Sequence, residues 1–395
     1  MKPELRRIGL LSALLACSSI TGLAQNVWKG TWATAVEWTG QGDMPKESLS
    51  NRSCRQIIHV SMGGNELRLK LSNELGNAPV EMKAVYIADT DKDHNWDVNA
   101  KTTRRLTFGG KKTVTLTAGQ AVYSDPCRYD LKTGQRLTVT IDYGSQTPEH
   151  ATSHRGSRTT SYIVKQKNTP YEDGEKVDHW YNMAALEVKA EAQTPTVAVL
   201  GNSITDGRGS TTNQQNRWTD FLSDALNAEH PYGVLNLGIG GNCVVQGGLS
   251  QPAMQRFDRD ILGQQGVTHL VVFEGTNDIG CSGGNYEHVA DTLIACYKVL
   301  VAKAREKGIK VYGATITPTK GNGWYSYWHE AIRQTVNEWI RKEGNFDGLI
   351  DFDLLVRDPA DPQRLNAEYS DDWLHLNPKG YEVMGKYAAE IINRQ

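Results

Sequence analysis

The stretch TVAVLGNSITDG, residues 196–207, decides the fold of the second half of the chain. Its first five residues form a short apolar run, which is typical of a strand buried on both faces of a parallel sheet. Gly201, Asn202 and Ser203 then indicate a tight turn into a helix. A serine at such a turn presents its hydroxyl above the sheet, near the positive end of the helix. The alternative is an ordinary N-cap serine, and this segment alone does not decide between the two.

Downstream of this stretch, short apolar runs alternate with amphipathic helical patterns. Further strands are predicted at 234–239, 269–273, 310–316 and 348–352, and helices at 218–226, 288–307, 324–341 and 378–392. This alternation predicts an α/β fold, a doubly wound parallel sheet of five strands with helices on both faces. Ligands of such sheets bind at the carboxyl ends of the strands, so the loops after the first three strands are where we expect the chemistry.

Upstream of residue 190 the apolar pattern has a period of two. The runs 66–71 and 136–141 alternate strictly, and similar runs lie at 56–62, 80–88, 111–117 and 158–165. Many short, half-buried strands separated by turns predict an all-β sandwich of jelly-roll type. Residues 166–195 are expected to be a connector with some strand at 185–188. The expected organisation is a β-sandwich domain over 25–192 and a second, α/β domain over 193–395.

The first 24 residues have the layout of a signal peptide: a basic start, an apolar stretch over 8–16 and a cleavage site after Ala24. Leu14-Leu15-Ala16-Cys17 also resembles a bacterial lipobox, in which Cys17 carries a lipid. The sequence leaves these two interpretations open. Both predict export, to the periplasm, the extracellular space or a lipid anchor on the outer membrane or cell surface. No other stretch reaches the ~20 apolar residues of a transmembrane helix, so no span is expected.

Composition excludes some classes of function. The chain has 395 residues, of which 39% are hydrophobic and 22% charged, so it has enough apolar material for real cores. Its 43 Lys and Arg stand against 45 Asp and Glu. Without residues 1–24 the balance is 40 against 44, a net charge of −4. A chain with no basic excess is not expected to bind nucleic acid, and this charge fits a neutral glycan ester as substrate.

Three further blocks follow the predicted strands or lie near the C-terminus. The glycines of 236–242 let a backbone N–H turn toward a ligand, and Asn277 in 275–278 is either a turn former or an amide donor to an oxyanion. Asp372 and His375, three residues apart on a tight turn, can meet so that the carboxylate orients the imidazole. Each block alone is weak evidence. Their common position at one edge of one sheet is what favours a catalytic site.

Together these blocks resemble the SGNH (GDSL) hydrolase superfamily, in the family order. They are the serine block 201–203, the glycine block with Gly241, the asparagine block 275–278, and Asp372 with His375. A preceding β domain with the segments 30–33 and 68–73 resembles secreted bacterial SGNH esterases of the acetylxylan-esterase kind. The chain departs from the family at Asn202, where aspartate is usual. We expect this to be a tolerated variant rather than a sign of an inactive enzyme.

The resemblance implies a role for each of these residues. Ser203 is the nucleophile, His375 takes its proton, and Asp372 orients His375 and stabilises its charged form. The oxyanion hole is expected to consist of the backbone N–H groups of Ser203 and Gly241 and the side-chain amide of Asn277. No cofactor is expected.

The expected function is that of a secreted serine esterase that removes acyl groups, acetyl above all, from polysaccharides or oligosaccharides. Its expected partner is an acylated carbohydrate; the oligomeric state is not predicted. A lipase, arylesterase or thioesterase of the same superfamily would share every catalytic residue. A glycan-binding protein with an inert hydrolase domain is the third alternative.

Some residues have two interpretations. The aromatic residues of 324–328 either stack on sugar rings or pack their helix onto the sheet, with packing favoured. Arg217 and Trp218 are expected to be structural. The chain has no CxxC or HExxH, and no metal site is expected. An exported chain tolerates disulfides, and the candidate pairs are Cys243 with Cys281 and Cys54 with Cys127, leaving Cys296 in a helix.

Overall fold

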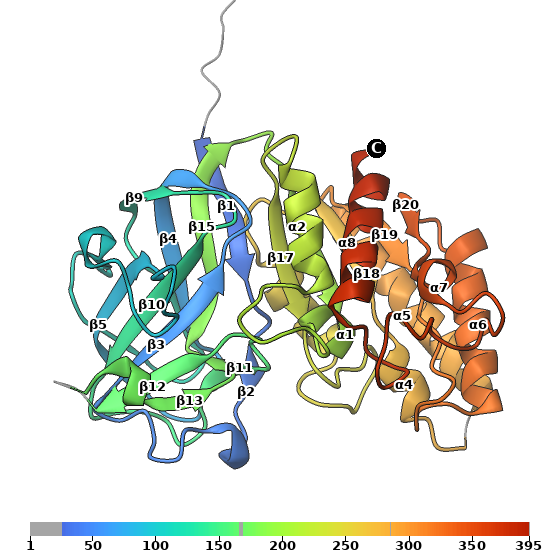
Figure 1. Cartoon of the computed structure of the whole chain (residues 1–395), viewed down its shortest axis with the longest axis horizontal. Helices are drawn as coiled ribbons and strands as arrows, with labels where there is room; N and C mark the ends of the chain where they lie inside the picture. The colour runs from blue at the N-terminus through green and yellow to red at the C-terminus, as the bar shows by residue number, and fades with distance from the viewer. Residues whose placement is uncertain (1–25, 166–168, 285, 395) are drawn as a thin grey trace, which may run out of the picture.

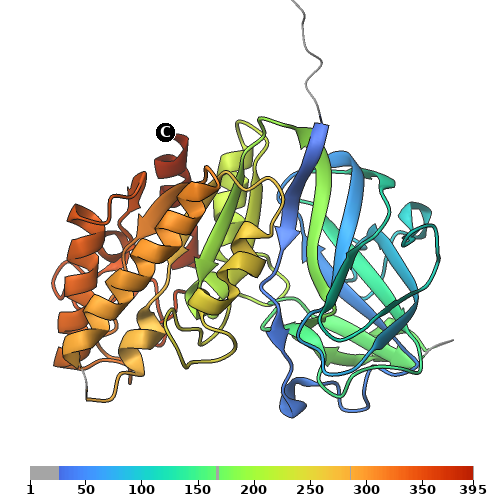
Figure 2. The ribbon, with the colours of Figure 1, turned by 180° about the vertical axis from the view of Figure 1, so that it is seen from behind.

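The computed structural model of the chain describes residues 26–165, 169–284 and 286–394. The first half consists of antiparallel sheets and the second of a parallel sheet flanked by helices, and the two lie side by side (Figures 1 and 2). The predicted signal peptide and Cys17 lie outside the described residues. Among the described helices, none has the length and apolar character needed to cross a membrane.

The first half of the chain contains three antiparallel sheets. One has the order β1-β15-β4-β8, with β9 paired to β4, and comprises β1 (Asn26–Ala33), β15 (Met183–Glu191), β4 (Gly64–Asn73), β8 (Gln120–Tyr123) and β9 (Cys127–Leu131). The second comprises β13 (Glu175–Val177), β12 (Ser161–Lys165), β3 (Arg52–His59), β10 (Arg136–Tyr143), β5 (Val80–Asp89) and β6 (Arg104–Arg105), with β7 (Val114–Leu116) paired to β5. The third and smallest comprises β14 (His179–Tyr181), β11 (Thr152–Arg155) and β2 (Glu37–Trp38).

The period-two pattern explains why these strands share a core. On β4 the leucines at 67, 69 and 71 are buried while the residues between them are partly exposed, and β10 buries Leu137, Val139 and Ile141 in the same cluster. Described helical turns in this half are short: η1 (Gln41–Asp43), η2 (Ala100–Thr102) and η3 (Tyr171–Asp173). The prediction of an all-β first half is therefore confirmed. Its jelly-roll connectivity stays a prediction.

The expected connector contains a central strand, which corrects the sequence interpretation. β15 (Met183–Glu191) pairs with both β1 and β4. Its residues 183–188 are all buried, because one face covers the sandwich core, through Leu186, and the other packs with Ala185 against the α/β half. A strand buried on both faces shows no alternation, so the period-two criterion does not find it.

The second half confirms the predicted α/β fold. Its five parallel strands have the order β17-β16-β18-β19-β20, with β17 (Gly233–Gly238), β16 (Thr196–Gly201), β18 (His269–Phe273), β19 (Lys310–Ala314) and β20 (Gly348–Ile350). One face is covered by α1 (Ser203–Asp206), α2 (Trp218–Asn227), α7 (Phe352–Val356) and α8 (Pro378–Asn393). The other is covered by α3 (Ala253–Phe257), the π-helical turn η4 (Asp258–Leu262), α4 (Thr276–Gly280), α5 (Tyr286–Glu306) and α6 (Tyr327–Lys342).

The strands predicted at 111–117, 158–165, 310–316 and 348–352 are shorter than expected, and for two of them the reason is local. The last strand ends at Ile350 because the Asp351 side chain accepts the N–H of Leu354 and caps α7. The run 158–165 becomes strand only from Ser161, because Arg158 has a left-handed backbone with φ of +55°. The predicted division between residues 192 and 193 falls between β15 and β16 and remains a proposal.

The two halves meet along their edge strands β1 and β17. A Cβ atom at Gly233 would lie 2.3 Å from the carbonyl oxygen of Gly30, so the two backbones approach too closely for any side chain there. The backbone N–H of Val234 also donates to Ser61 Oγ at 2.9 Å. This close contact allows residues of the first half to reach the carboxyl edge of the parallel sheet.

Candidate active site

Ser203 lies at the start of α1, directly after β16. The cap of this helix is Asn202, whose side-chain oxygen accepts the Ile204 N–H at 3.1 Å. The N-cap interpretation of Ser203 is therefore wrong, because its neighbour has that role. The Ser203 hydroxyl instead lies 2.8 Å from His375 Nε2.

His375 is held on a tight turn just before α8. Its Nδ1 lies 2.7 Å from Asp372 Oδ2, and its backbone N–H donates to Asp372 Oδ1 at 2.7 Å. Ser370 Oγ donates to the His375 carbonyl oxygen at 2.7 Å and fixes the turn from the other side. Serine, histidine and aspartate thus form one continuous line of hydrogen bonds.

The electrostatics of this line favour a neutral imidazole and a charged carboxylate. Burial lowers the pKa of His375 below its ordinary value, against the hydrogen bond and charge of Asp372, and the positive charges of Arg208 and Arg158 lower it further. Burial alone would raise the pKa of Asp372, but hydrogen bonds from His375 hold it below its ordinary value. A neutral histidine next to a serine hydroxyl is able to act as a general base near neutral pH.

The predicted oxyanion residues line the same cleft as Ser203. Gly241, in the loop after β17, has φ of +72°, and a Cβ atom there would lie 2.8 Å from Leu249 Cδ1, so glycine is required. Asn277 on α4 donates through Nδ2 to the Asn242 carbonyl oxygen at 2.8 Å. Among the described residues, the N–H groups of Ser203 and Gly241 donate to no backbone carbonyl. The two N–H groups therefore remain available to a ligand.

Asp278 joins the loops that carry Gly241 and Asn277. Its two carboxylate oxygens accept the N–H groups of Val244, at 2.8 Å, and Val245, at 3.0 Å. Burial raises the pKa of Asp278 to about 6. Asp278 belongs to the asparagine block 275–278, but no local sequence pattern predicts its bridging role.

A buried glutamate next to Asn202 is a second feature that the sequence did not predict. Glu274 directly follows β18, is fully buried, and accepts hydrogen bonds from Asn202 Nδ2 and from the Gly275 N–H, both at 3.0 Å. Burial raises its pKa to about 8, although Arg256 Nη2 lies 4.0 Å away. The sequence feature that could have indicated Glu274 is a charged residue directly after the apolar run 269–273.

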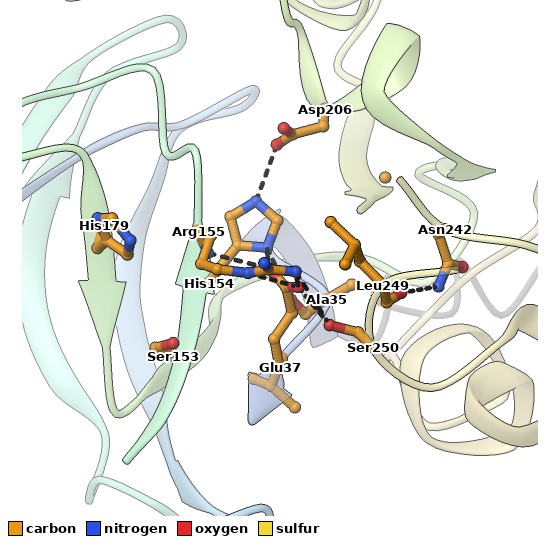
Figure 3. Close-up of polar contacts among 12 residues, drawn as sticks. Ala35, Glu37, Ser153, His154, Arg155, His179, Asp206, Asn242, Leu249 and Ser250 are labelled. Carbon is orange, nitrogen blue, oxygen red and sulfur yellow. Dashed lines mark hydrogen bonds and ion pairs between the residues drawn. The ribbon is translucent and has the colours of Figure 1, made fainter. Parts of the chain in front are cut away.

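The cleft around Ser203 has a volume of about 240 Å³ and receives side chains from both halves of the chain. The first half contributes Glu37, Arg155, Gly156 and Arg158. Figure 3 shows part of this junction, with Glu37 and Arg155 next to Ser250 of the loop that follows Gly241. Sequence analysis found none of these residues, because nothing local in a β-strand pattern marks a residue that lines a distant site.

The remaining sequence expectations have mixed outcomes. Tyr327 is 82% exposed, Trp328 is 63% exposed but stacks on the Tyr286 ring of α5, and Trp324 lines the cleft. Arg217 and Trp218 are buried, which confirms their structural role. The cysteines at 54, 127, 243, 281 and 296 are free, so neither candidate disulfide is formed. Among the described residues, no group of three or more His, Cys, Asp and Glu is placed to hold a metal ion.

Comparison with known proteins gives one family match. Residues 199–383 match the GDSL-like Lipase/Acylhydrolase family. Among curated proteins, the N-acylneuraminate cytidylyltransferase of Escherichia coli O18:K1:H7 is 30% identical over 124 residues, which make up 31% of this chain and 28% of that protein. The chain thus spans less than a third of the length of this relative.

Solved structures with similarity cover about half of the chain. A carbohydrate acetylesterase from Sinorhizobium meliloti is 14% identical over 51% of this chain and 99% of its own, with a TM-score of 0.40. A mutant of an acetyl-xylooligosaccharide esterase from Geobacillus is 18% identical over 50% of this chain and 94% of its own, with a TM-score of 0.39. A GDSL-like lipase from Bacteroides thetaiotaomicron is 21% identical over 50% of this chain and 88% of its own, also with a TM-score of 0.39.

The segment that matches the family begins in β16, ends in α8 and contains Ser203, Asp372 and His375. Residues 199–383 are therefore similar to the GDSL-like Lipase/Acylhydrolase family.

Proposed function

We propose that the protein is an exported serine esterase that removes acyl groups, acetyl above all, from carbohydrates. The observation that carries this proposal is the line of two hydrogen bonds, 2.8 Å from Ser203 Oγ to His375 Nε2 and 2.7 Å from His375 Nδ1 to Asp372 Oδ2. It lies in a cleft next to two backbone N–H groups and an amide, which is the arrangement that acyl transfer needs.

The proposed reaction has two halves. His375 Nε2 takes the hydroxyl proton while Ser203 Oγ attacks the ester carbonyl carbon, and the carbonyl oxygen becomes an oxyanion. The imidazolium then donates its proton to the leaving alcohol oxygen, which leaves the acyl group on Ser203. Water, deprotonated by His375, attacks this acyl-enzyme, and the acid and the free serine are released.

Each donor of the proposed oxyanion hole has a defined support. The N–H of Ser203 is the first of α1, Gly241 is held in a left-handed conformation, and the Asn277 amide is fixed by Asn242. A single such donor typically contributes about 3 kcal/mol to lowering the barrier. The proton that Nδ1 shares with Asp372 keeps Nε2 free to accept the serine proton.

The features next to the cleft support a sugar ester. Trp324 lines the cleft, and Tyr327 is exposed at the start of α6, as an aromatic face that stacks on a sugar ring would be. Apart from Trp324 and two leucines, the lining is polar or glycine.

The direct test is hydrolysis of 4-nitrophenyl acetate and release of acetate from acetylated xylo-oligosaccharide. Ser203→Ala is expected to lose at least roughly 1,000-fold in kcat/KM on both, with Ser145→Ala, an exposed serine of the first half, as the matched control. Activity that persists in Ser203→Ala would overturn the proposal.

A series of 4-nitrophenyl esters from acetate to octanoate separates the main alternative. The proposal predicts the highest kcat/KM for acetate. A maximum for octanoate would assign the protein to the lipase type instead.

A further inference from the structure

Three arginines from both halves of the chain line the cleft that holds Ser203. Arg155 and Arg158 come from the end of β11 and the turn after it, and Arg208 comes from the loop after α1. The carboxylates lining the same cleft are Glu37 and Asp206. Positive charge therefore gathers at one spot of a chain whose net charge is −2.

Both carboxylates already have cationic partners. Glu37 accepts two hydrogen bonds from the Arg155 guanidinium, at 3.1 and 2.5 Å (Figure 3). Asp206 accepts one from Arg158 Nη2 at 2.6 Å and faces His154 Nε2 at 2.9 Å. The two carboxylates of the cleft thus pair with Arg155 and Arg158, and neither of them neutralises the positive charge of Arg208.

Two of the arginines have donors that the described part of the chain does not use. The Arg208 side chain is exposed, and its guanidinium forms no hydrogen bond or ion pair with another of the described residues. Arg158 Nε is buried and has no hydrogen-bond partner there. A guanidinium with free N–H groups in a cleft is suited to bind a carboxylate.

The backbone holds Arg158 in place at a conformational cost. Its φ of +55° is unusual for a residue with a side chain, and its carbonyl oxygen accepts the N–H of Asn213 from the second half at 2.9 Å. Such strain occurs preferentially at binding and catalytic sites. A Cβ atom at Gly156 would lie 2.8 Å from Arg158 Nη2, so the turn is shaped around this guanidinium.

Both charges act at the reaction centre. Arg208 and Arg158 each contribute to lowering the pKa of His375, after burial, which is the larger cause. Their guanidinium groups are therefore within electrostatic reach of the ester that Ser203 would attack.

We propose that Arg208 and Arg158 form a carboxylate-binding site beside Ser203, so that the preferred substrate is an ester whose sugar or acyl part carries a carboxylate. This inference rests on the proposed esterase function and replaces the neutral glycan ester that the net charge had favoured. An O-acetylated uronic acid is the substrate of this kind that also fits a carbohydrate esterase.

The test compares matched charged and neutral esters on the full chain. The sugar arm uses O-acetylated methyl galacturonoside against O-acetylated methyl galactoside, and the acyl arm uses 4-nitrophenyl hemisuccinate against 4-nitrophenyl butyrate. The measured quantity is the ratio of kcat/KM for the charged ester to kcat/KM for the neutral one. Because each ratio is taken within one protein preparation, partial unfolding of a variant cancels.

The wild-type ratio is expected to exceed one in at least one arm and to fall roughly tenfold in Arg208→Gln. Arg208→Lys, which keeps the positive charge, is expected to have a ratio between those of Arg208→Gln and the wild type. Arg128→Gln, an exposed arginine on β9, is the control and is expected to keep the wild-type ratio. A wild-type ratio near one in both arms, or equal ratios in wild type and Arg208→Gln, would overturn the carboxylate site while leaving the esterase standing. Failure to cleave any of the four esters would instead overturn the esterase function, and this inference with it.

Discussion

At the scale of the residue, the contact with Glu274 explains why residue 202 is an asparagine. Asn202 donates through Nδ2 to Glu274, a fully buried carboxyl group, while its oxygen caps α1. An aspartate in this position would keep the cap but would place two carboxyl groups at hydrogen-bond distance in a buried site, with no hydrogen to share once both ionise. The departure from the usual family residue is thus matched to Glu274.

Asn202→Asp is therefore expected to destabilise the protein increasingly as pH rises. Glu274 has a folded-state pKa raised to about 8, so the stability that its neutral form gives is fully present below its unfolded pKa and is lost as pH rises through 8. A second carboxylate raises that pKa further and deepens the loss, to on the order of 3 kcal/mol at pH 9. Urea unfolding of the wild type and of Asn202→Asp at pH 6 and pH 9 measures this loss in the free energy of unfolding.

The double variant Asn202→Asp with Glu274→Gln is the control for this effect. The glutamine amide donates to the new carboxylate, and the extra loss at high pH is expected to disappear. An equal loss in the single and double variants would show that the pair is not coupled.

At the scale of the element, the loops after the strands are held together by Asp278. The strands themselves were largely predictable, because a buried strand shows as a run of consecutive apolar residues and a half-buried strand as alternating apolar and polar residues. The short helix α4, which carries Asn277, was not predicted, since five residues show no helical period. The bridge from Asp278 to the Gly241 loop depends on tertiary structure and leaves no local pattern.

Asp278→Ala is expected to reduce kcat more than it changes KM. The change leaves two N–H groups, of Val244 and Val245, without acceptors and frees the loop that carries Gly241. The expected loss is about 2 kcal/mol of stability and roughly tenfold in kcat. Steady-state kinetics with 4-nitrophenyl acetate, alongside thermal unfolding, checks both.

Asp278→Asn, which keeps one side-chain acceptor, is expected to lie between the wild type and Asp278→Ala. If Asp278→Ala lost stability but kept full kcat, the bridge would be structural only.

At the scale of the whole molecule, the first half contributes side chains to the cleft that contains Ser203. His154 of β11 points at Asp206 of α1, the helix that begins with Ser203, and its other nitrogen lies 2.8 Å from the Ala35 carbonyl oxygen (Figure 3). Sequence analysis predicted both halves and the second half's own site residues. It did not find the contribution of the first half, since contacts across the junction follow from the docking of edge strands.

The contact between His154 and Asp206 is expected to make stability depend on pH. Burial lowers the pKa of His154, but the hydrogen bond and charge of Asp206, with Glu37, outweigh it and raise the pKa above the ordinary value of 6.5. A raised histidine pKa gives stability that is fully present below 6.5 and is lost as pH rises through the folded-state value.

The difference in unfolding free energy between wild type and His154→Gln should therefore be larger at pH 6 than at pH 9. Urea titrations at the two pH values measure it, and His230→Gln, an exposed histidine in the loop after α2, serves as the control. A difference that is independent of pH would mean that His154 is neutral in the folded protein.

The central claim is that Ser203, activated by His375, is the nucleophile. An organophosphate ester that phosphorylates activated serine hydroxyls tests it directly, with the labelled peptide identified by mass spectrometry. The account predicts one phosphorylated residue, Ser203, loss of esterase activity in step with labelling, and no labelling in His375→Ala. Loss of activity with the label on another residue, or labelling of His375→Ala as fast as wild type, would contradict it.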